Sequence, residues 1–281
     1  MKRTLSLLLA LVMVASAATF TASAADDAKM PFRDVKSGKW FYDAVYSVWS
    51  LGIMGGVSDT EFSPNGALSR AMFVTILGRM AGAPETGFTP DTFPDTKKNT
   101  WYSPYVGWAM EAGIVGGFDD GTFRPNANLT REQMAKAMAI YIDVSGVKMP
   151  RETTAPSAFS DEKKVAAWAR EYVEVLRRAG IVNGVGGGRF APNGTITRQE
   201  AATMIARAAK CCGLDVSVSE AASVLAQYSG GAAVADWAAE TLALCLSSGL
   251  LDADGTATAP LRPILRCEVA RSVYRLLNEA R

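Results

Sequence analysis

Histidine is absent from this chain of 281 residues. Its absence excludes Ser-His-Asp triads, HExxH zinc sites and every mechanism in which an imidazole acts as acid or base. An excess of charge of one sign is also lacking, since 29 Lys and Arg stand against 28 Asp and Glu. A globally basic surface for nucleic acid is therefore not expected, and nucleic acid is not among the predicted partners.

Cysteines are few and confined to the last third of the chain. Their spacing does not match a CxxC pair of zinc ligands, so we expect no metal and no cofactor. Cys245 and Cys267 fall on two predicted helices, which leaves open a disulfide between them or two buried thiols. The four positions are Cys211, Cys212, Cys245 and Cys267.

Long hydrophobic runs are lacking after the N-terminus. Residues 1–24 have the pattern of a signal peptide, with a basic start at Lys2, an apolar run and an A-x-A cleavage site ending at Ala24. The apolar run is shorter than the ~20 residues that span a bilayer. We therefore predict a secreted protein with no membrane span after cleavage and a net charge near −1.

The chain does contain one unit written four times. Each unit has a tryptophan, a glycine twelve residues later, and an arginine 29 or 30 residues after the tryptophan. Self-similarity at this spacing is typical of tandem repeats that pack on one another. The tryptophans are Trp40, Trp101, Trp168 and Trp237, and the arginines are Arg70, Arg131, Arg198 and Arg266.

Each unit is predicted to be helix, glycine-rich loop, helix. In the second copy, Pro104 suits the start of a first helix and Gly113 its end. Thr130 with Gln133 forms a capping box at the start of a second helix. The loop between them carries Asp-Gly turn chemistry, which explains its acidic residues better than a calcium site does. The fold class is therefore mainly α.

The units are separated by linkers rich in glycine and proline. We place them at residues 25–82, 91–146, 157–213 and 226–281. The fourth is degenerate, because Tyr228-Ser229-Gly230 stands where the others have Phe-x-Asp. We expect it to keep the fold and to lose most of any ligand affinity.

The order of motifs resembles the S-layer homology repeat. The motifs are Phe-x-Asp, the tryptophan, a first helix ending in Gly-Ile, a Gly- and Phe-containing loop, and Thr-Arg-x-Glu on the second helix. Three copies match along nearly their whole length. The resemblance implies a pseudo-threefold helical module, here with an appended fourth unit. It also implies attachment at the cell wall or S-layer through a secondary cell-wall polysaccharide, often pyruvylated, held in grooves between repeats.

The resemblance also implies which residues contact the ligand. They are the loop Asp, the Trp, the loop Gly and the motif Arg of each of the first three copies. Carried onto this sequence, they are Asp34, Trp40, Gly56, Arg70, Asp95, Trp101, Gly117, Arg131, Asp161, Trp168, Gly184 and Arg198.

The same residues have a chemical interpretation of their own. An arginine just inside a helix N-terminus is mildly unfavourable, and an anion held by both the guanidinium and the helix end would compensate it. Tryptophan offers a flat face for a sugar ring. The alternative is that the arginine pairs with a carboxylate of the protein, such as Asp34, Asp95 or Asp161, and that the tryptophan belongs to the core.

Two other functions are open. The repeats could dock other exported proteins, or the fourth unit could mediate self-association or bind a protein partner. Paired carboxylates could instead hydrolyse wall glycans. The candidates Glu111, Glu132 and Asp119-Asp120 each have a helix-surface or turn explanation. We therefore expect a glycan-binding protein without enzymatic activity.

Overall fold

The computed structural model describes residues 30–85, 93–118, 120–144, 157–211, 217–252 and 258–279. The predicted signal peptide lies outside these residues. The described part is helical, with isolated β-bridges in place of a sheet. The mainly α class is thus confirmed.

Each unit supplies two helices, and the second always begins at the motif arginine. We call the first helix of a unit outer and the second inner. A short helix, α8 (Ala221–Ala226), precedes the fourth unit. The outer and inner helices are, in order, α2 (Tyr42–Ser50) and α3 (Arg70–Met80), α4 (Ser103–Glu111) and α5 (Arg131–Val144), α6 (Arg170–Arg178) and α7 (Arg198–Cys211), α9 (Asp236–Ser247) and α10 (Arg266–Glu279).

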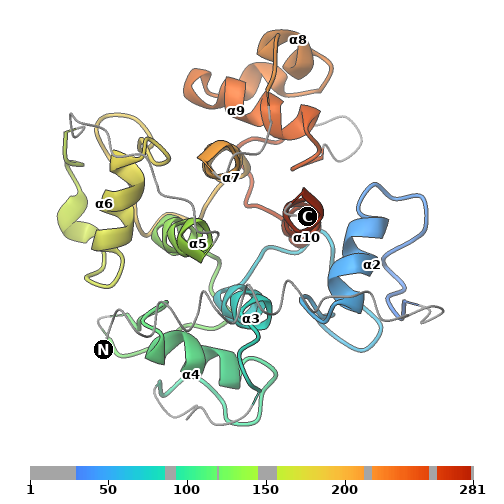
Figure 1. Cartoon of the computed structure of the whole chain (residues 1–281), viewed down its shortest axis with the longest axis vertical. Helices are drawn as coiled ribbons and strands as arrows, with labels where there is room; N and C mark the ends of the chain where they lie inside the picture. Colours follow the sequence, from blue (N-terminus) through green and yellow to red (C-terminus); the bar gives the residue numbers. More distant parts are fainter. Residues whose placement is uncertain are drawn as a thin grey trace.

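The four inner helices surround the centre of the molecule, and the outer helices lie at the periphery (Figure 1). Each inner helix packs on the outer helix of the following unit: α3 on α4, α5 on α6 and α7 on α9. The series closes on itself, because α10 packs on α2. As expected, no unit buries its helices alone, because each inner helix is covered by the outer helix of the following unit.

The contact between one inner-helix start and the next unit's loop recurs at four seams. Isolated β-bridges mark them at Ser69 with Asn128, Thr130 with Thr195, Thr197 with Pro263, and Ala67 with Leu265. The last joins the first unit to the fourth. The fourth unit is therefore not appended to a threefold module, as the sequence had led us to expect. It is the closing member of a four-membered ring.

At every seam the first amides of the inner helix donate to carbonyls of the neighbouring loop. Arg70 N lies 2.9 Å from Ala127 O, and Ala71 N lies 3.0 Å from Pro125 O. The closing seam repeats this with Arg266 N to Gly66 O at 2.9 Å. These are groups that a helix leaves without internal partners. They need no anion, contrary to the expectation that a ligand anion occupies the helix end.

A strained turn in each loop positions the carbonyls that accept from the first amides of the neighbouring inner helix. The residue after the loop phenylalanine has positive φ without being glycine, as Ser63 does at 58°, a conformation that costs ~1 kcal/mol. The Asp34 carboxylate holds it by accepting from Phe62 N at 2.9 Å and Ser63 N at 2.7 Å. Asp95 and Asp161 make the same pair of bonds in their own units.

The Phe-x-Asp phenylalanine packs beneath the same loop. The ring centroids of Phe32 and Phe62 are 5.6 Å apart, and equivalent pairs occur in the second and third units. The loop phenylalanines Phe62, Phe123 and Phe190 are fully buried, which confirms their predicted place in the core.

The fourth unit replaces this device with Thr258. Its amide and its hydroxyl both donate to Ser229 O, and its side chain is fully buried.

Cys245 is buried and donates its thiol to Ala202 O at 3.4 Å. No disulfide joins it to Cys267, so the structure selects buried thiols over a staple. Burial raises the pKa of Cys245 to about 12.

Lys136 is a buried cation on α5, with 1% of its surface exposed. Its ammonium donates to the Gly113 carbonyl and lies 5.0 Å from the Trp168 ring centre and 4.6 Å from that of Tyr172. Desolvation lowers its pKa from 10.5 to about 8. The charged form is therefore less stable in the fold than in the unfolded chain.

The closing seam predicts the effect of Arg266→Met. The substitution leaves two carbonyls of the first unit without their guanidinium donor, at about 1–3 kcal/mol each. We expect the free energy of unfolding, measured with urea by circular dichroism, to fall by about 2 kcal/mol or more. Arg178→Met, at an exposed arginine, serves as the control. A loss as small as the control's would mean that the seam does not stabilise the ring.

The burial of Lys136 predicts a pH-dependent stability. Below about pH 8 the lysine is protonated in both states, and its desolvation cost subtracts fully from stability. Between pH 8 and 10.5 the unfolded chain binds the proton more tightly, so stability rises with pH. The wild type should therefore gain about 2 kcal/mol relative to Lys136→Met between pH 7 and pH 10. A constant difference between the two proteins over that range would contradict the burial argument.

Candidate functional site: grooves between neighbouring units

The motif arginines cross the seams and bind the next unit's loop. Arg70 donates from Nε to Phe123 O at 2.6 Å and from Nη2 to Gly116 O at 3.1 Å. Arg266 makes the equivalent bonds, to Phe62 O at 2.9 Å and Gly55 O at 2.7 Å. Each guanidinium also lies over the loop phenylalanine, 4.5 Å from its ring centre. All four arginines are buried, so the structural role of each is to hold two neighbouring units together.

The arginines differ in how their charge is balanced. Arg131 forms an ion pair with Glu200 at 3.2 Å, and Arg198 forms one with Glu268, both side chains being fully buried. The hydrogen bonds of Arg70 and Arg266 go to neutral carbonyls, and desolvation lowers the pKa of each to about 10. Both remain cationic at neutral pH. The internal carboxylate partners are therefore glutamates where they exist, and the three loop aspartates hydrogen-bond to backbone amides instead.

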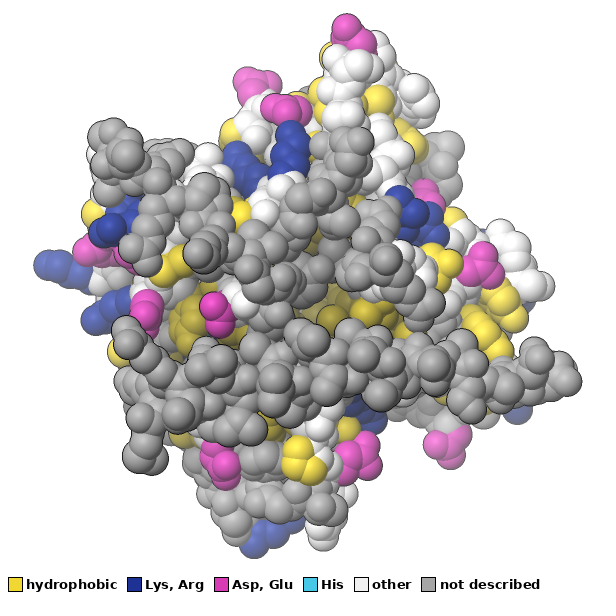
Figure 2. Space-filling view, viewed as in Figure 1, with side chains coloured by type: hydrophobic (Ala, Val, Ile, Leu, Met, Phe, Trp, Pro, Cys, Tyr) yellow, Lys and Arg dark blue, Asp and Glu magenta, His cyan; other side chains and the backbone are white. Residues whose placement is uncertain are grey.

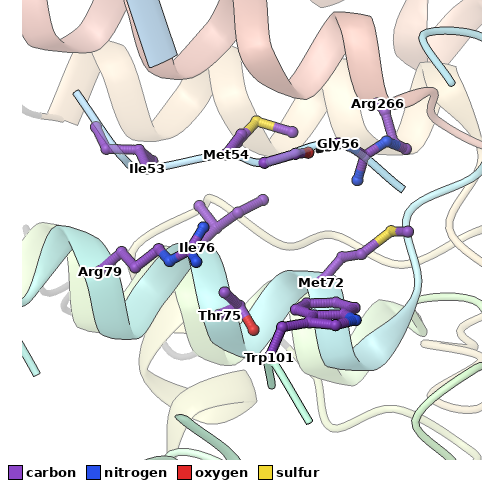
Figure 3. A pocket seen from close by; sticks show the side chains of 10 residues that line it. Ile53, Met54, Gly56, Met72, Thr75, Ile76, Arg79, Trp101 and Arg266 are labelled. Atoms are coloured by element: carbon purple, nitrogen blue, oxygen red, sulfur yellow. Dashed lines mark hydrogen bonds between the residues drawn. The ribbon is translucent and has the colours of Figure 1, made fainter. Parts of the chain in front are cut away.

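Groove 1 lies between three units. Its walls are the loop of the first unit, the helix α3, the tryptophan of the second unit and the arginine of the fourth, around a cavity of about 80 Å³. Figure 3 shows Arg266 and Arg79 at opposite ends, with Trp101 beside Met72 and with Thr75 between the arginines. The full lining is Ile53, Met54, Gly55, Gly56, Met72, Thr75, Ile76, Arg79, Trp101 and Arg266.

The polar and aromatic groups of groove 1 suit an acidic sugar. Trp101 is 53% exposed, which is unusual for so large an apolar side chain, and presents a face on which a sugar ring can stack. Arg79 donates to the Tyr105 hydroxyl at 3.2 Å, and that hydroxyl donates to Glu85 at 2.8 Å. The groove thus combines two guanidiniums, one tryptophan face and a threonine hydroxyl.

Groove 3 has the same composition on the opposite side of the ring. It takes its arginine, Arg131, from the second unit, its loop from the third and its tryptophan, Trp237, from the fourth, around about 200 Å³. Thr203 and Arg207 occupy the positions of Thr75 and Arg79. Trp237 is 39% exposed. Glu200, which neutralises Arg131, stands where groove 1 has Met72.

The predicted site residues separate into three groups. Gly56 with Trp101, and Arg131 with Gly184, come together in grooves 1 and 3. Arg70 and Arg198 lie in the other two seams, and Trp40 and Trp168 are half-buried against the core. Asp34, Asp95, Asp161 and Gly117 shape their own loops. Ligand contact by any of the twelve stays a prediction.

The loop glycines are required by packing. A Cβ on Gly56 would lie 2.5 Å from the Phe32 ring and 2.3 Å from Ser58 O, and one on Gly117 would lie 2.4 Å from the Phe93 ring. Any side chain there would force the loop off the phenylalanine beneath it. The glycines therefore place the groove wall, whether or not they also contact a ligand.

Sequence reasoning missed half of each groove. It placed the ligand in grooves between repeats but took the contact residues only from the motifs of the first three units, whereas each groove combines a loop from one unit, a tryptophan from the next and an arginine from the previous one. Met72, two residues after Arg70 in sequence, lines the same groove as Arg266 of the fourth unit. The available signal was the recurrence of Arg and Thr on two inner helices. The residues missed are Thr75, Arg79, Thr203, Arg207, Trp237 and Arg266.

Charged side chains of both signs are scattered around the rim of the described surface in Figure 2, without a field of one sign. No described helix is long and apolar enough to cross a membrane. In grooves 1 and 3, guanidiniums and an exposed tryptophan line the same cavity.

Comparison with known proteins gives the same repeats. The sequence profile of the S-layer homology domain matches residues 31–72, 92–135 and 158–202. These matches lie within the first three units as we divided them, and the fourth unit falls outside them. Our exact unit boundaries stay a prediction.

Relatives share this region and differ elsewhere. The chain is 35% identical over 191 residues to an amylopullulanase of Thermoanaerobacterium thermosulfurigenes, 26% over 194 residues to an S-layer protein of Bacillus thuringiensis subsp. finitimus, and 28% over 180 residues to a cellulosome-anchoring protein of Acetivibrio thermocellus. The matches cover 68%, 69% and 63% of this chain. They cover only 10%, 23% and 39% of the respective relatives.

The helical repeats, their motif arginines and the matches in three successive stretches agree with one another. S-layer homology domains anchor proteins to the cell wall and are found in cell-surface and S-layer proteins. The chain belongs to the S-layer homology family through three such domains, which its fourth unit closes into a ring.

Proposed function

We propose that this protein attaches non-covalently to a bacterial cell wall by holding acidic sugars of a wall polysaccharide in its inter-unit grooves. The observation that carries the proposal is groove 1, where an exposed tryptophan stands beside two guanidiniums whose hydrogen bonds go to neutral oxygens. A carboxylate on a sugar, such as a pyruvate ketal, would form charge-assisted hydrogen bonds with these guanidiniums. The sugar ring would stack on Trp101.

The fourth unit takes part in this proposal. The sequence suggested that it had lost most of its ligand affinity, yet its Arg266 forms one end of groove 1. We therefore assign it a binding role in the groove of the first unit. Self-association or a protein partner through this unit stays a prediction.

An anchoring role without catalysis is the form of the proposal that the relatives support. Proteins named as an amylopullulanase, an S-layer protein and a cellulosome-anchoring protein share this region and little of the rest of their length with the chain. What they have in common is more simply a means of attachment than a reaction. On this basis we place the protein at the cell surface, in the wall or S-layer.

A protein-docking scaffold is less well supported. It requires a contiguous apolar patch. The large exposed hydrophobic side chains of the described residues are Val57, Trp101, Trp237 and Leu261. One lies in the first unit, one in the second and two in the fourth, and the two tryptophans line grooves.

The proposal predicts the behaviour of Trp101→Ala in a sedimentation assay with purified wall sacculi. The wild type should bind intact sacculi and fail to bind sacculi stripped of their secondary polysaccharide. The variant should bind about tenfold more weakly, because a stacking surface worth about 1.4 kcal/mol is lost. Leu261→Ala, which removes an exposed apolar side chain outside the grooves, is the matched control.

The motif arginines are unsuitable for this test, since they also hold the seams. Unfolding by urea should show that Trp101→Ala retains its stability. The proposal fails if the wild type binds stripped sacculi equally well, or if Trp101→Ala and Leu261→Ala bind as tightly as the wild type.

A further inference from the structure

We infer that the ring has two glycan sites, grooves 1 and 3, and that Arg79 and Arg207 are the second anion-contacting residue of each. The inference rests on the proposed function and goes beyond it. It fixes the number of sites, their positions and a pair of residues outside the repeat motifs.

The inner helices differ at two positions that face the grooves. Five residues after the motif arginine stand Thr75 and Thr203 in the first and third units, but Lys136 and Arg271 in the second and fourth. Nine residues after it, the first, third and fourth units carry Arg79, Arg207 and Arg275, and the second carries Ile140. The first of these two positions thus alternates around the ring, and the two units with threonine lie opposite each other (Figure 1).

The groove of the second unit is filled by the protein itself. A Cβ on Gly116 would lie 2.5 Å from Trp168, so the indole rests directly on the loop. Behind it, the buried ammonium of Lys136 lies over the rings of Trp168 and Tyr172. A ligand that stacked on Trp168 would have to displace this cation–aromatic contact, which the protein already makes.

In the groove of the fourth unit, the motif arginine is neutralised within the protein. Arg198 is paired with Glu268, and both side chains are fully buried. Arg271 and Arg275 donate to the carbonyls of Gly249 and Ser248 at 2.9 Å each, at the end of their own unit's outer helix. Since these acceptors are neutral, this groove differs from grooves 1 and 3 in the burial of its tryptophan rather than in its cations.

Tryptophan exposure follows the same alternation. Trp101 and Trp237, which line grooves 1 and 3, are 53% and 39% exposed. Trp40 and Trp168 are half-buried against the core. Trp40 also has its indole nitrogen buried, with no hydrogen-bond partner among the described residues. The two grooves that contain an open cavity are therefore the two whose tryptophan is exposed.

The two arginines of an open groove suit a ligand with more than one acidic group. Arg266 and Arg79 lie at opposite ends of groove 1 in Figure 3. Arg207 of groove 3 donates to Ile181 O at 3.3 Å, again a neutral oxygen. An oligosaccharide with acidic groups on successive sugars could reach both ends. Since Met72 replaces the glutamate that neutralises Arg131, groove 1 should be the tighter site.

The test is a calorimetric titration with short oligosaccharides prepared from the secondary wall polysaccharide, native and carboxyl-reduced. The wild type should bind two native oligosaccharides per chain and the reduced ones far more weakly. Trp101→Ala and Trp237→Ala should each weaken one of the two sites by about tenfold and leave the other unchanged. Arg79→Gln should weaken the tighter site, and Arg207→Gln the other, by about tenfold or more, as expected for a lost charge-assisted hydrogen bond.

Arg178→Gln, at an exposed arginine outside the grooves, is the control for the charge change. Absence of binding by the wild type to both oligosaccharides and intact sacculi would overturn the proposed function. Binding with one, three or four sites, or affinities unchanged in Arg79→Gln and Arg207→Gln, would overturn the inference while leaving the proposed function intact.

Discussion

The rest of the structure depends on a guanidinium that crosses from one unit to the next. At each of the four seams, an arginine at the start of an inner helix donates to loop carbonyls of the neighbouring unit, while the helix's first amides bind other carbonyls of that loop. One contact therefore ends the loop, caps the helix and joins two units. It also explains why the turn before the loop proline accepts a positive φ and an aspartate to hold it. That turn aims the carbonyls at the arginine.

The seam and the ligand groove share a wall, and this restricts how the protein can vary. A motif arginine cannot be altered for the sake of a ligand without loosening the ring, because an unsatisfied buried carbonyl is costly. Variation is therefore confined to positions deeper along the inner helices. Lys136 is an example of such variation: a long cationic side chain at this position fills the groove, which then becomes part of the core. Thr75 and Thr203, being short, leave the space open.

Local features of the fold were predictable from the sequence, and those that depend on another unit were not. The glycine helix ends and the buried phenylalanines follow from spacing and are observed. Of the capping box, the bond from Thr130 N to the Gln133 side chain is observed, whereas the Thr130 hydroxyl has no hydrogen-bond partner among the described residues. The destination of the motif arginines could not be predicted, because their acceptors are backbone oxygens, which no residue type encodes. The hydrogen-bond partners of Asp34 could not be predicted for the same reason, since they are backbone amides 28 and 29 residues away. Ring closure was hidden by the symmetry of the repeats, which does not specify how many complete a turn.

The closing seam has a consequence for when the protein can work. Arg266 and the Gly55 carbonyl are 211 positions apart in sequence, and both belong to the same groove wall. Contacts of such separation form late, because the intervening chain must first be organised. Groove 1 is therefore incomplete until α10, the helix that carries Arg266, has docked on the first unit. Any variant of this chain that is interrupted before α10 would lack one wall of a groove whose other residues belong to the first two units.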